Sequence, residues 1–259
     1  MNASDAGRKA ASPVAVVTGA ASGIGLEIAI DLAARGYRIA ACDIAWPDEA
    51  IQRIRGADGE ALCIRADVAD QAAVDAAVQE SLRRFGRIDV LVNNAGLFTT
   101  LTRGAADAID PQEWRRVMDV NVTGTWLFSR AVLAPMRAQR RGRIVNITSA
   151  TAFSTPPSML HYVTSKGAVT AMTSALAREV GVDGITVNAV APGFTLSSGV
   201  RLHRAEGLEV QSARARSARA IPRDQEPRDL LGAVAFFAGD ESGFVTGQTL
   251  VVDGGGVMR

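Results

Sequence analysis

A tyrosine and a lysine four residues apart, Tyr162 and Lys166, are the residues of this sequence best suited to move a proton. On a helix, this spacing places both side chains on one face, about 6 Å apart along the axis. A nearby ammonium group favours a phenolate, so we expect Lys166 to lower the phenol pKa of Tyr162 from its usual value of about 10. The pair would then act as an acid/base group near neutral pH.

Ser149 lies just after an apolar run, Arg143–Ile147, that predicts a strand. Its hydroxyl group could therefore point into the same cleft and hold a substrate oxygen. The chain has only two lysines and two tyrosines, which makes a chance Tyr-x-x-x-Lys pair rare. The competing interpretation is an exposed Tyr/Lys pair without a chemical role. Together, the three residues predict a proton-transfer site for an alcohol or a carbonyl compound.

A glycine-rich loop follows the first predicted strand, Pro13–Thr18, and precedes an amphipathic helix, Ile24–Gly36. Its glycines would let the backbone approach a pyrophosphate, and the helix N-terminus would supply N–H groups and a positive dipole. The spacing is G-x-x-x-G-x-G and differs from the commonest dinucleotide fingerprint, so a glycine turn without a ligand is the alternative. The loop residues expected to bind a coenzyme are Gly19, Ser22, Gly23, Ile24 and Gly25.

Asp43 closes the second predicted strand, Tyr37–Ile44, and lies 18 residues after Gly25. A carboxylate at this distance from the glycine loop typically binds the ribose hydroxyls of NAD and repels the 2′-phosphate of NADP. Neither Ser22 in the loop nor Ile44 after the aspartate can neutralise that phosphate. We therefore expect NAD as the coenzyme, with Asp43 and Ile44 at its adenosine end. A strand-end aspartate in water is the alternative.

The rest of the chain alternates between strand and helix patterns. This alternation predicts right-handed crossovers and one α/β domain: a Rossmann-type, doubly wound parallel sheet of about seven strands with helices on both faces. The domain would span residues 13–259, after a flexible tail at residues 1–12. The further strands expected are Ala61–Ala66, Ile88–Val92, Arg143–Ile147, Thr186–Val190 and Thr249–Val252, and the further helices are Gln71–Phe85, Pro111–Arg140, Tyr162–Gly181 and Pro227–Gly239.

A long segment without a regular pattern, residues 194–223, predicts a lid over the substrate pocket. Apolar side chains of this segment and of the loops before it would form the pocket walls, which suits an aryl or alkyl ketone or secondary alcohol. The wall residues expected are Leu97, Phe98, Ala150, Phe153, Pro156, Met159, Phe194, Leu196 and Leu202.

The composition excludes several other classes of protein. A net charge of +1 and the absence of a basic run argue against nucleic acid or an anionic membrane as partner. No apolar run approaches the ~18 residues needed to span a bilayer, and we expect no signal peptide. Cys42 and Cys63 lack metal-ligand spacing, so we expect buried, reduced thiols, no metal site and a cytoplasmic protein. His161 and His203 are expected in a wall or surface role.

Several further motifs appear in order: Asp67-Val68, Asn93-Asn94-Ala95-Gly96, Asn121 in DVNVTG, Pro192-Gly193 and a closing TGQTLVVDGG. Together with the glycine loop and the interval of 13 residues between Ser149 and Tyr162, this set resembles the short-chain dehydrogenase/reductase family. The resemblance covers nearly the whole chain, from about Val14 to Gly255.

The resemblance implies roles for particular residues. Asp67 and Val68 would contact the adenine, and Asn94, Ala95 and Gly96 would lie along the coenzyme. Asn121 would hold a water in a proton relay from Lys166 to solvent; asparagine is a poor residue for a helix interior, which independently favours a role. Tyr162 and Lys166 would also contact the coenzyme, with Lys166 on the nicotinamide ribose.

Pro192 and Gly193 would flank the nicotinamide. The family usually has a threonine five positions after that proline, where this chain has Ser197, and Thr195 lies nearby. Either hydroxyl could meet the carboxamide group.

The implied activity is hydride transfer between NAD(H) and a secondary alcohol or ketone, with Tyr162 as acid/base and Ser149 holding the substrate oxygen. The runner-up is a 3-oxoacyl-[acyl-carrier-protein] reductase-like enzyme, whose usual preference for NADP(H) fits poorly with Asp43. A nicotinamide-binding regulator without turnover is the alternative from another class, but it would need no acid/base group. The resemblance also implies a homotetramer.

Overall fold

The computed structural model describes residues 12–46, 48–56, 60–203 and 207–258. The predicted tail lies outside these residues except for Ser12, whose carbonyl oxygen accepts hydrogen bonds from Arg38. Seven parallel strands form one sheet in the order β3-β2-β1-β4-β5-β6-β7, which confirms the predicted doubly wound sheet. The strands are β1 (Val14–Thr18), β2 (Arg38–Asp43), β3 (Ala61–Arg65), β4 (Val90–Asn93), β5 (Gly142–Ile147), β6 (Ile185–Pro192) and β7 (Thr249–Val252).

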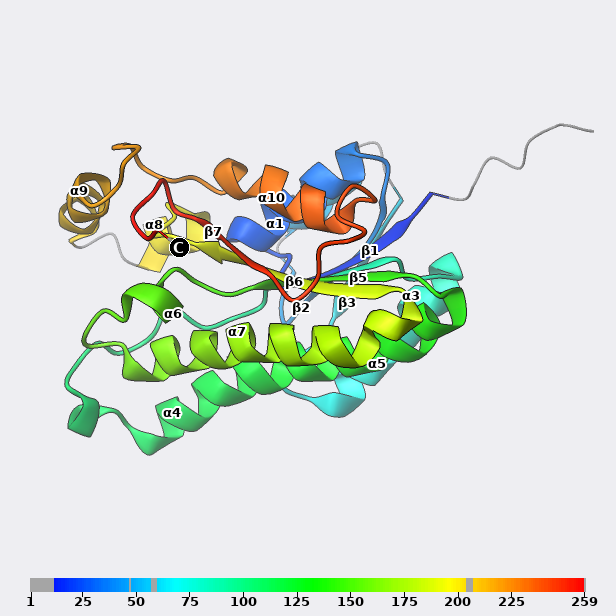
Figure 1. Cartoon of the computed structure of the whole chain (residues 1–259), viewed down its shortest axis with the longest axis horizontal. Coiled ribbons are helices and arrows are strands. Elements are labelled where there is room, and N and C mark those ends of the chain that lie inside the picture. Colours follow the sequence, from blue (N-terminus) through cyan, green and yellow to red (C-terminus); the bar gives the residue numbers. More distant parts are fainter. Residues whose placement is uncertain (1–11, 47, 57–59, 204–206, 259) are drawn as a thin grey trace, which may run out of the picture.

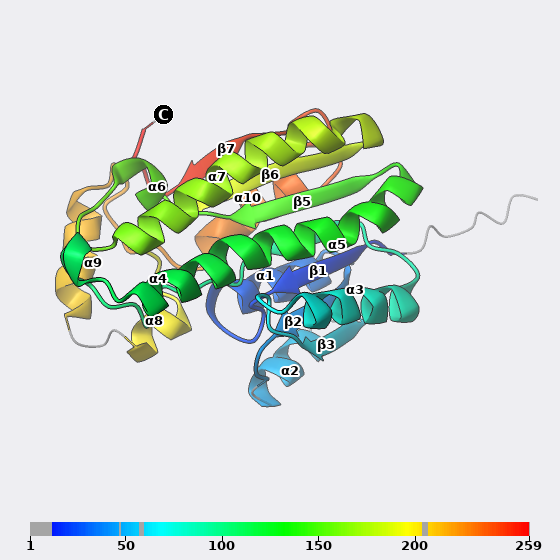
Figure 2. The same ribbon diagram turned by 90° about the horizontal axis from the view of Figure 1, so that it is seen from below.

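Helices cover both faces of the sheet, as predicted (Figure 1). On one face are α1 (Gly23–Ala34), α2 (Asp48–Arg55) and α10 (Arg228–Ala238). On the other face are α3 (Gln71–Phe85), α5 (Gly124–Gln139) and α7 (Leu160–Val180), with α4 (Pro111–Met118) leading into α5 (Figure 2). No helix of the described part of the chain is long and apolar enough to cross a membrane.

Strand β1 shows why its sequence, VAVVT, forms the centre of the sheet. All five residues are buried, because successive side chains point to opposite faces and both faces are covered. Val16 joins the core that contains Phe128 of α5, whereas Val17 joins the core that contains Leu230 of α10. A continuous apolar run is therefore what this position in the sheet requires.

The helix ends explain why most predicted bounds lie within two residues of those observed. Asp70 accepts hydrogen bonds from the backbone N–H groups of Ala72 (2.8 Å) and Ala73 (3.3 Å), and so fixes the start of α3. Gly86 ends the helix in the left-handed conformation, with φ of 77°. At the start of α4, Asp110 acts as Asp70 does in α3, because it accepts a hydrogen bond from Gln112 N at 2.8 Å.

Two predictions of local structure are wrong, and the sequence analysis also missed a helix. The expected continuous helix Pro111–Arg140 contains a π-helical turn, η2 (Asp119–Thr123), between α4 and α5. Helix α2 was not predicted. The segment at 194–223 is not irregular, because it contains α8 (Ser198–His203) and α9 (Leu208–Ser217). Only Ser212 of α9 is buried, so the helix has no apolar stripe by which its sequence could show a helical period.

Candidate active site

A cleft of about 1340 Å³ opens at the carboxyl ends of the central strands. It lies where the strand order reverses between β1 and β4, and α8 and α9 lie at the same end of the molecule (Figure 2). Its volume exceeds the roughly 300–1,000 Å³ of ordinary small-molecule pockets. A dinucleotide and a second molecule can therefore fit together. All the predicted site residues line this cleft except Gly25 and Asn121, which support it from behind.

The glycine loop between β1 and α1 is held by the end of β4. Asn94 Nδ2 donates to the carbonyl oxygens of Thr18 (3.1 Å) and Gly19 (3.0 Å), while the Thr18 hydroxyl accepts from the backbone N–H of Asn94 at 3.0 Å. A Cβ at Gly25 would overlap the carbonyl oxygen of Gly19 and the amide of Asn94. Only glycine fits there, so the close contact between this loop and Asn94 depends on Gly25.

Asp43 is fixed beside this loop at the end of β2. Its carboxylate accepts from Ala21 N at 2.9 Å and from Ile44 N at 2.7 Å. Ile44 is 58% exposed, and Asp67 and Val68 line the same cleft. The structure thus brings together the residues predicted for the adenosine end of a coenzyme.

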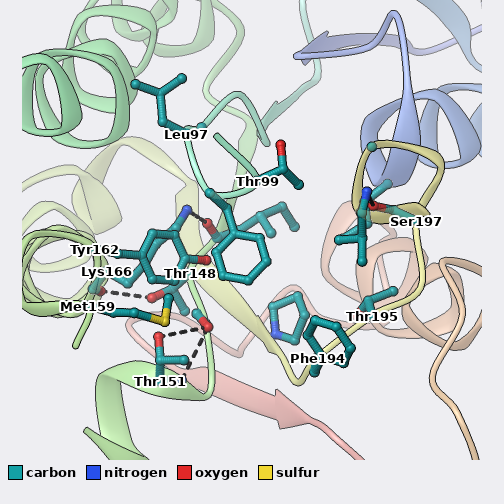
Figure 3. A pocket seen from close by; sticks show the side chains of 18 of the residues that line it. Leu97, Thr99, Thr148, Thr151, Met159, Tyr162, Lys166, Phe194, Thr195 and Ser197 are labelled. Carbon is teal, nitrogen blue, oxygen red and sulfur yellow. Dashed lines mark hydrogen bonds between the residues drawn. The ribbon is translucent and has the colours of Figure 1, made fainter. Parts of the chain in front are cut away.

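Tyr162 and Lys166 are both buried on α7, with 7% and 5% of their surface exposed. Figure 3 shows them together in the cleft. Lys166 Nζ donates to the carbonyl oxygen of Ile147 at 2.8 Å and lies 5.8 Å from the centre of the Tyr162 ring. Ser149 lines the cleft with Tyr162 and acts to lower the phenol pKa. The structure therefore places the three predicted proton-transfer residues in one site.

Burial dominates the pKa values of this pair. Burial raises the pKa of Tyr162 to about 12, and the hydrogen bond from Ser149 offsets part of that rise. Burial also lowers the pKa of Lys166 to about 8. The predicted lowering of the Tyr162 pKa by Lys166 is wrong in this structure, because desolvation dominates the phenol pKa and the ammonium group donates to the carbonyl oxygen of Ile147. At neutral pH, Tyr162 is a protonated donor.

Asn121 lies in the π-helical turn, behind the loop that follows β4. Its Oδ1 accepts from Leu97 N at 2.7 Å, and its Nδ2 donates to Ser165 Oγ at 3.0 Å. A Cβ added at Gly96 would lie 3.2 Å from Asn121 Oδ1 and 3.5 Å from Lys166 Nζ. Asn121 thus ties the loop to α7 immediately beside Lys166.

The two candidate hydroxyls after Pro192 and Gly193 lie against different parts of the cleft. Thr195 Oγ1 donates to the carbonyl oxygen of Gly193 at 3.0 Å. Ser197 packs against the glycine loop, since its Cβ lies 3.5 Å from where a Cβ of Gly23 would be. Thr195 therefore lies beside Gly193, and Ser197 lies beside the glycine loop.

Comparison with known proteins decides the family. Residues 19–256 match the family model described as enoyl-(acyl carrier protein) reductase. The chain is 43% identical over 252 residues to the short-chain reductase protein NovJ of Streptomyces niveus, covering 93% of each chain. This protein belongs to the short-chain dehydrogenase/reductase family. It is therefore an oxidoreductase that acts on CH–OH or keto groups.

Two solved structures of the family contain NAD. A 3-oxoacyl-[acyl-carrier protein] reductase from Brucella melitensis in complex with NAD is 34% identical, with a TM-score of 0.87 over 96% of this chain and 98% of that one. An NAD⁺-bound xylitol dehydrogenase is 33% identical, with a TM-score of 0.86 over 94% of this chain and 98% of that one. The residues present here fit such a coenzyme, because a glycine loop in which Gly19 and Gly25 leave no room for a Cβ shares one cleft with the carboxylate of Asp43.

The cleft walls of this short-chain dehydrogenase/reductase agree in part with the prediction. Leu97, Phe98, Ala150, Pro156, Met159 and Phe194 line the cleft. Phe153, Leu196 and Leu202 do not line it, and Leu202 on α8 is 74% exposed. The helical turn that directs Leu202 away from the cleft was not visible in the sequence.

His161 and Cys63 also differ from expectation. His161 is completely buried, its ring nitrogens have no hydrogen-bond partner among the described residues, and its Nε2 lies 3.9 Å from Glu113 Oε1. It has neither a surface role nor a place in the cleft wall. His203 is exposed on α8. Cys42 is buried, as expected, but Cys63 is only half-buried.

Several residues of the site were missed by the sequence analysis. Thr148 Oγ1 donates to the carbonyl oxygen of Lys166 at 2.8 Å, and Thr151 contacts Ser149. Arg65 lies opposite Asp43 in the sheet, and its Nε donates to the carbonyl oxygen of Ile44 at 3.0 Å. Adjacent threonines around Ser149 were an available signal for the first two. Arg65 could not be recognised from the sequence, since it reaches Asp43 only through the register of strands β2 and β3.

Proposed function

We propose that this protein is an NAD(H)-dependent oxidoreductase that interconverts a ketone and a secondary alcohol with an apolar or aromatic body. The observation that supports this most strongly is the buried, protonated phenol of Tyr162 beside the Ser149 hydroxyl, in a cleft shared with the glycine loop. Phe98 packs on Tyr162 with ring centres 5.0 Å apart, and Met159 lines the same part of the site. An apolar substrate body fits against such side chains.

The proposed mechanism assigns one task to each residue. A bound nicotinamide coenzyme supplies or accepts the hydride. Tyr162 gives its proton to the substrate oxygen in reduction and removes it in oxidation, while Ser149 holds that oxygen. Lys166 binds the nicotinamide ribose. Asn121 holds a water through which Tyr162 exchanges its proton with solvent.

The proposed coenzyme contacts follow the order of the cleft. The glycine loop would hold the pyrophosphate, Asp43 and Ile44 would hold the adenosine ribose, and Asp67 and Val68 would hold the adenine. Asn94, Ala95 and Gly96 would also contact the coenzyme. Thr195, which is fixed to Gly193, would bind the carboxamide, and Ser197, which packs on the glycine loop, would bind near the pyrophosphate.

NAD(H) is proposed over NADP(H) because the Asp43 carboxylate would repel a 2′-phosphate. Arg65 is the nearest described cation in the sheet register, but it does not line the cleft. An Asp43→Ser variant removes the repulsion while Arg65 remains. Its preference for NADH over NADPH should fall at least tenfold, and the Asp43→Ser, Arg65→Ala double variant serves as the matched control for the contribution of Arg65.

A second candidate function, reduction of a 3-oxoacyl thioester, is favoured by two arginines. Arg103 and Arg214 line the cleft, and neither guanidinium bonds to another described residue. Desolvation lowers the pKa of Arg103, with no carboxylate to offset it. Such cations suit a substrate with an anionic extension, such as an acyl-carrier phosphopantetheine.

A panel of coenzymes and substrates distinguishes ketone reduction from 3-oxoacyl thioester reduction. NADH and NADPH oxidation is followed with aryl ketones, alkyl ketones and 3-oxoacyl thioesters at equal concentrations. The proposed function predicts the highest kcat/KM with NADH and a neutral ketone. A higher kcat/KM with the thioester, lost in Arg214→Gln, would establish the second candidate. Absence of turnover with every substrate would favour the regulator interpretation.

We also propose a lid and a homotetramer. Residues 194–223 would close over the substrate, as Gln211 and Arg214 of α9 line the cleft. In the tetramer, helices α5 and α7 would pack across one interface and the β7 edge across another. Exposed apolar residues support this arrangement: Trp126 on α5 is 48% exposed and Leu250 on β7 is 43% exposed.

A further inference from the structure

The Ser149 hydroxyl is hydrogen-bonded to Thr151, a residue to which no role has yet been assigned. The oxygen of Ser149 accepts two hydrogen bonds from Thr151, one from the backbone N–H at 3.2 Å and one from the Oγ1 hydroxyl at 3.0 Å. Both are drawn from Thr151 in Figure 3. Thr151 begins a short helix, α6 (Thr151–Ser154), and lines the cleft.

The number of hydrogen bonds determines the direction in which Ser149 can bond. A serine hydroxyl has one proton to donate and two lone pairs to accept with. Thr151 fills both lone pairs, so the only remaining capacity of Ser149 is to donate its proton. Any hydrogen bond that Ser149 makes to the Tyr162 phenol or to a substrate oxygen is therefore donated by Ser149.

Whether Ser149 donates or accepts a hydrogen bond affects the proton that Tyr162 must deliver to the substrate. With a free lone pair, Ser149 could accept the phenolic proton of Tyr162, and that proton would then point away from the substrate. With both lone pairs filled, the phenolic proton is left for the substrate oxygen. The single proton of Ser149 is then available to the substrate oxygen as that oxygen gains negative charge, and donation from Thr151 polarises it further.

We propose that Thr151 is a positioning residue that fixes Ser149 as a hydrogen-bond donor toward the substrate oxygen. This inference rests on the proposed roles of Tyr162 and Ser149. The chemistry is unchanged: hydride reaches the carbonyl carbon, the Tyr162 proton reaches the oxygen, and the resulting phenolate regains a proton from solvent. Thr151 neither gains nor loses a proton, and acts only through the orientation of Ser149.

The test compares Thr151→Val, which has nearly the same shape but no hydroxyl, with Thr151→Ser, which keeps the hydroxyl. Thr151→Val should lower kcat for ketone reduction about tenfold, because a misoriented donor costs part of what a lost donor costs. Its ketone KM and its Kd for NADH should stay within about twofold of wild type. Thr151→Ser should retain kcat within about threefold. NADH binding by both variants verifies that they fold.

A double-mutant cycle with Ser149→Ala makes the test specific. If Thr151 acts through Ser149, Thr151→Val has no further effect on kcat in the Ser149→Ala background. Full kcat in Thr151→Val, or the same tenfold loss in both backgrounds, would overturn the inference. Should Thr151→Val not bind NADH, Thr151→Ala takes its place with the same expectations. Wild-type turnover by Tyr162→Phe would instead show that the proposed function itself is wrong.

Discussion

At the scale of single residues, burial determines the chemistry of Tyr162 and Lys166. Burial raises the pKa of the phenol to about 12 and lowers that of the ammonium to about 8, so each group resists its charged form. The phenol therefore carries its proton under ordinary conditions. This state suits proton donation to a ketone oxygen and disfavours proton removal from an alcohol.

The two reaction directions should accordingly differ in pH dependence. We expect kcat for ketone reduction to change little between pH 6 and 8, because Tyr162 is protonated throughout. We expect kcat for alcohol oxidation to rise with pH over the range 7–10, because the phenolate form becomes more abundant as the pH approaches the raised pKa. Stopped-flow measurement at saturating substrate checks both, and an oxidation rate that is highest at pH 6 would contradict this assignment.

The buried ammonium of Lys166 should lower the stability of the protein without coenzyme. Its pKa in the folded state lies below the unfolded value of about 10.5, so the unfolded chain binds more protons between pH 8 and 10.5 and stability rises with pH there. Lys166→Met should be about 1–3 kcal/mol more stable than wild type at pH 7, and this advantage should vanish near pH 10.5.

Urea unfolding at pH 7 and pH 10 measures this difference. Lys166→Met should also lose turnover, so that stability and activity change in opposite directions. This account of Lys166 is wrong if Lys166→Met is less stable than wild type by the same amount at pH 7 and at pH 10.

At the scale of elements, the close contact between the glycine loop and β4 has the most direct consequence. A Cβ at Gly25 would overlap Gly19 and Asn94, so Gly25→Ala should displace the loop. We expect at least a 100-fold weaker Kd for NADH, measured by fluorescence titration. Gly167→Ala on α7 is the matched control, since a Cβ there meets nothing within 4 Å, and it should bind NADH as wild type does. Equal NADH affinity in both variants would refute this account of the loop.

Elements with a local signal could be predicted from the sequence. The strands have buried apolar runs, and α3 has both its Asp70 cap and its Gly86 end, so its bounds Gln71–Phe85 were predicted without error. Helix α9 has no apolar face, and the π-helical turn at Asn121 interrupts an otherwise continuous helical pattern. Neither feature changes the residue pattern enough to be seen.

The site was predictable in its residue types but not in its contacts across elements. The spacing of Tyr162 and Lys166 indicated a common face, and the structure has it. The burial of His161 against Glu113 depends on how α4 packs on α7, and the sign of the Tyr162 pKa change depends on how deeply the cleft encloses the phenol. These are properties of tertiary packing.

At the scale of the whole molecule, several exposed apolar residues lie in the part of the chain that includes α10, the following loop and the edge strand β7. Phe236 on α10 is 41% exposed, Phe244 in the following loop is fully exposed and Leu250 lies on the edge strand β7. Such residues are typical of a surface that is covered in an assembly.

We therefore expect a Phe244→Asp, Leu250→Glu variant to elute as a smaller species than wild type in size-exclusion chromatography with light scattering. Val210→Asp on α9 is the control, because Val210 is 74% exposed but lies outside this edge, and its mass should equal that of wild type. A wild-type protein that is already monomeric at micromolar concentration would rule out the proposed tetramer.

The central claim is that the Tyr162 phenol exchanges a proton with the substrate. It is tested most directly by kcat of Tyr162→Phe for ketone reduction, with the Kd for NADH measured on the same sample. Tyr37→Phe is the control, because Tyr37 is the other tyrosine of the chain and its hydroxyl donates to the carbonyl oxygen of Ala238, against α10. We predict a loss in kcat of about 10³-fold for Tyr162→Phe, with NADH affinity nearly unchanged and Tyr37→Phe close to wild type. Wild-type kcat in Tyr162→Phe would contradict the claim.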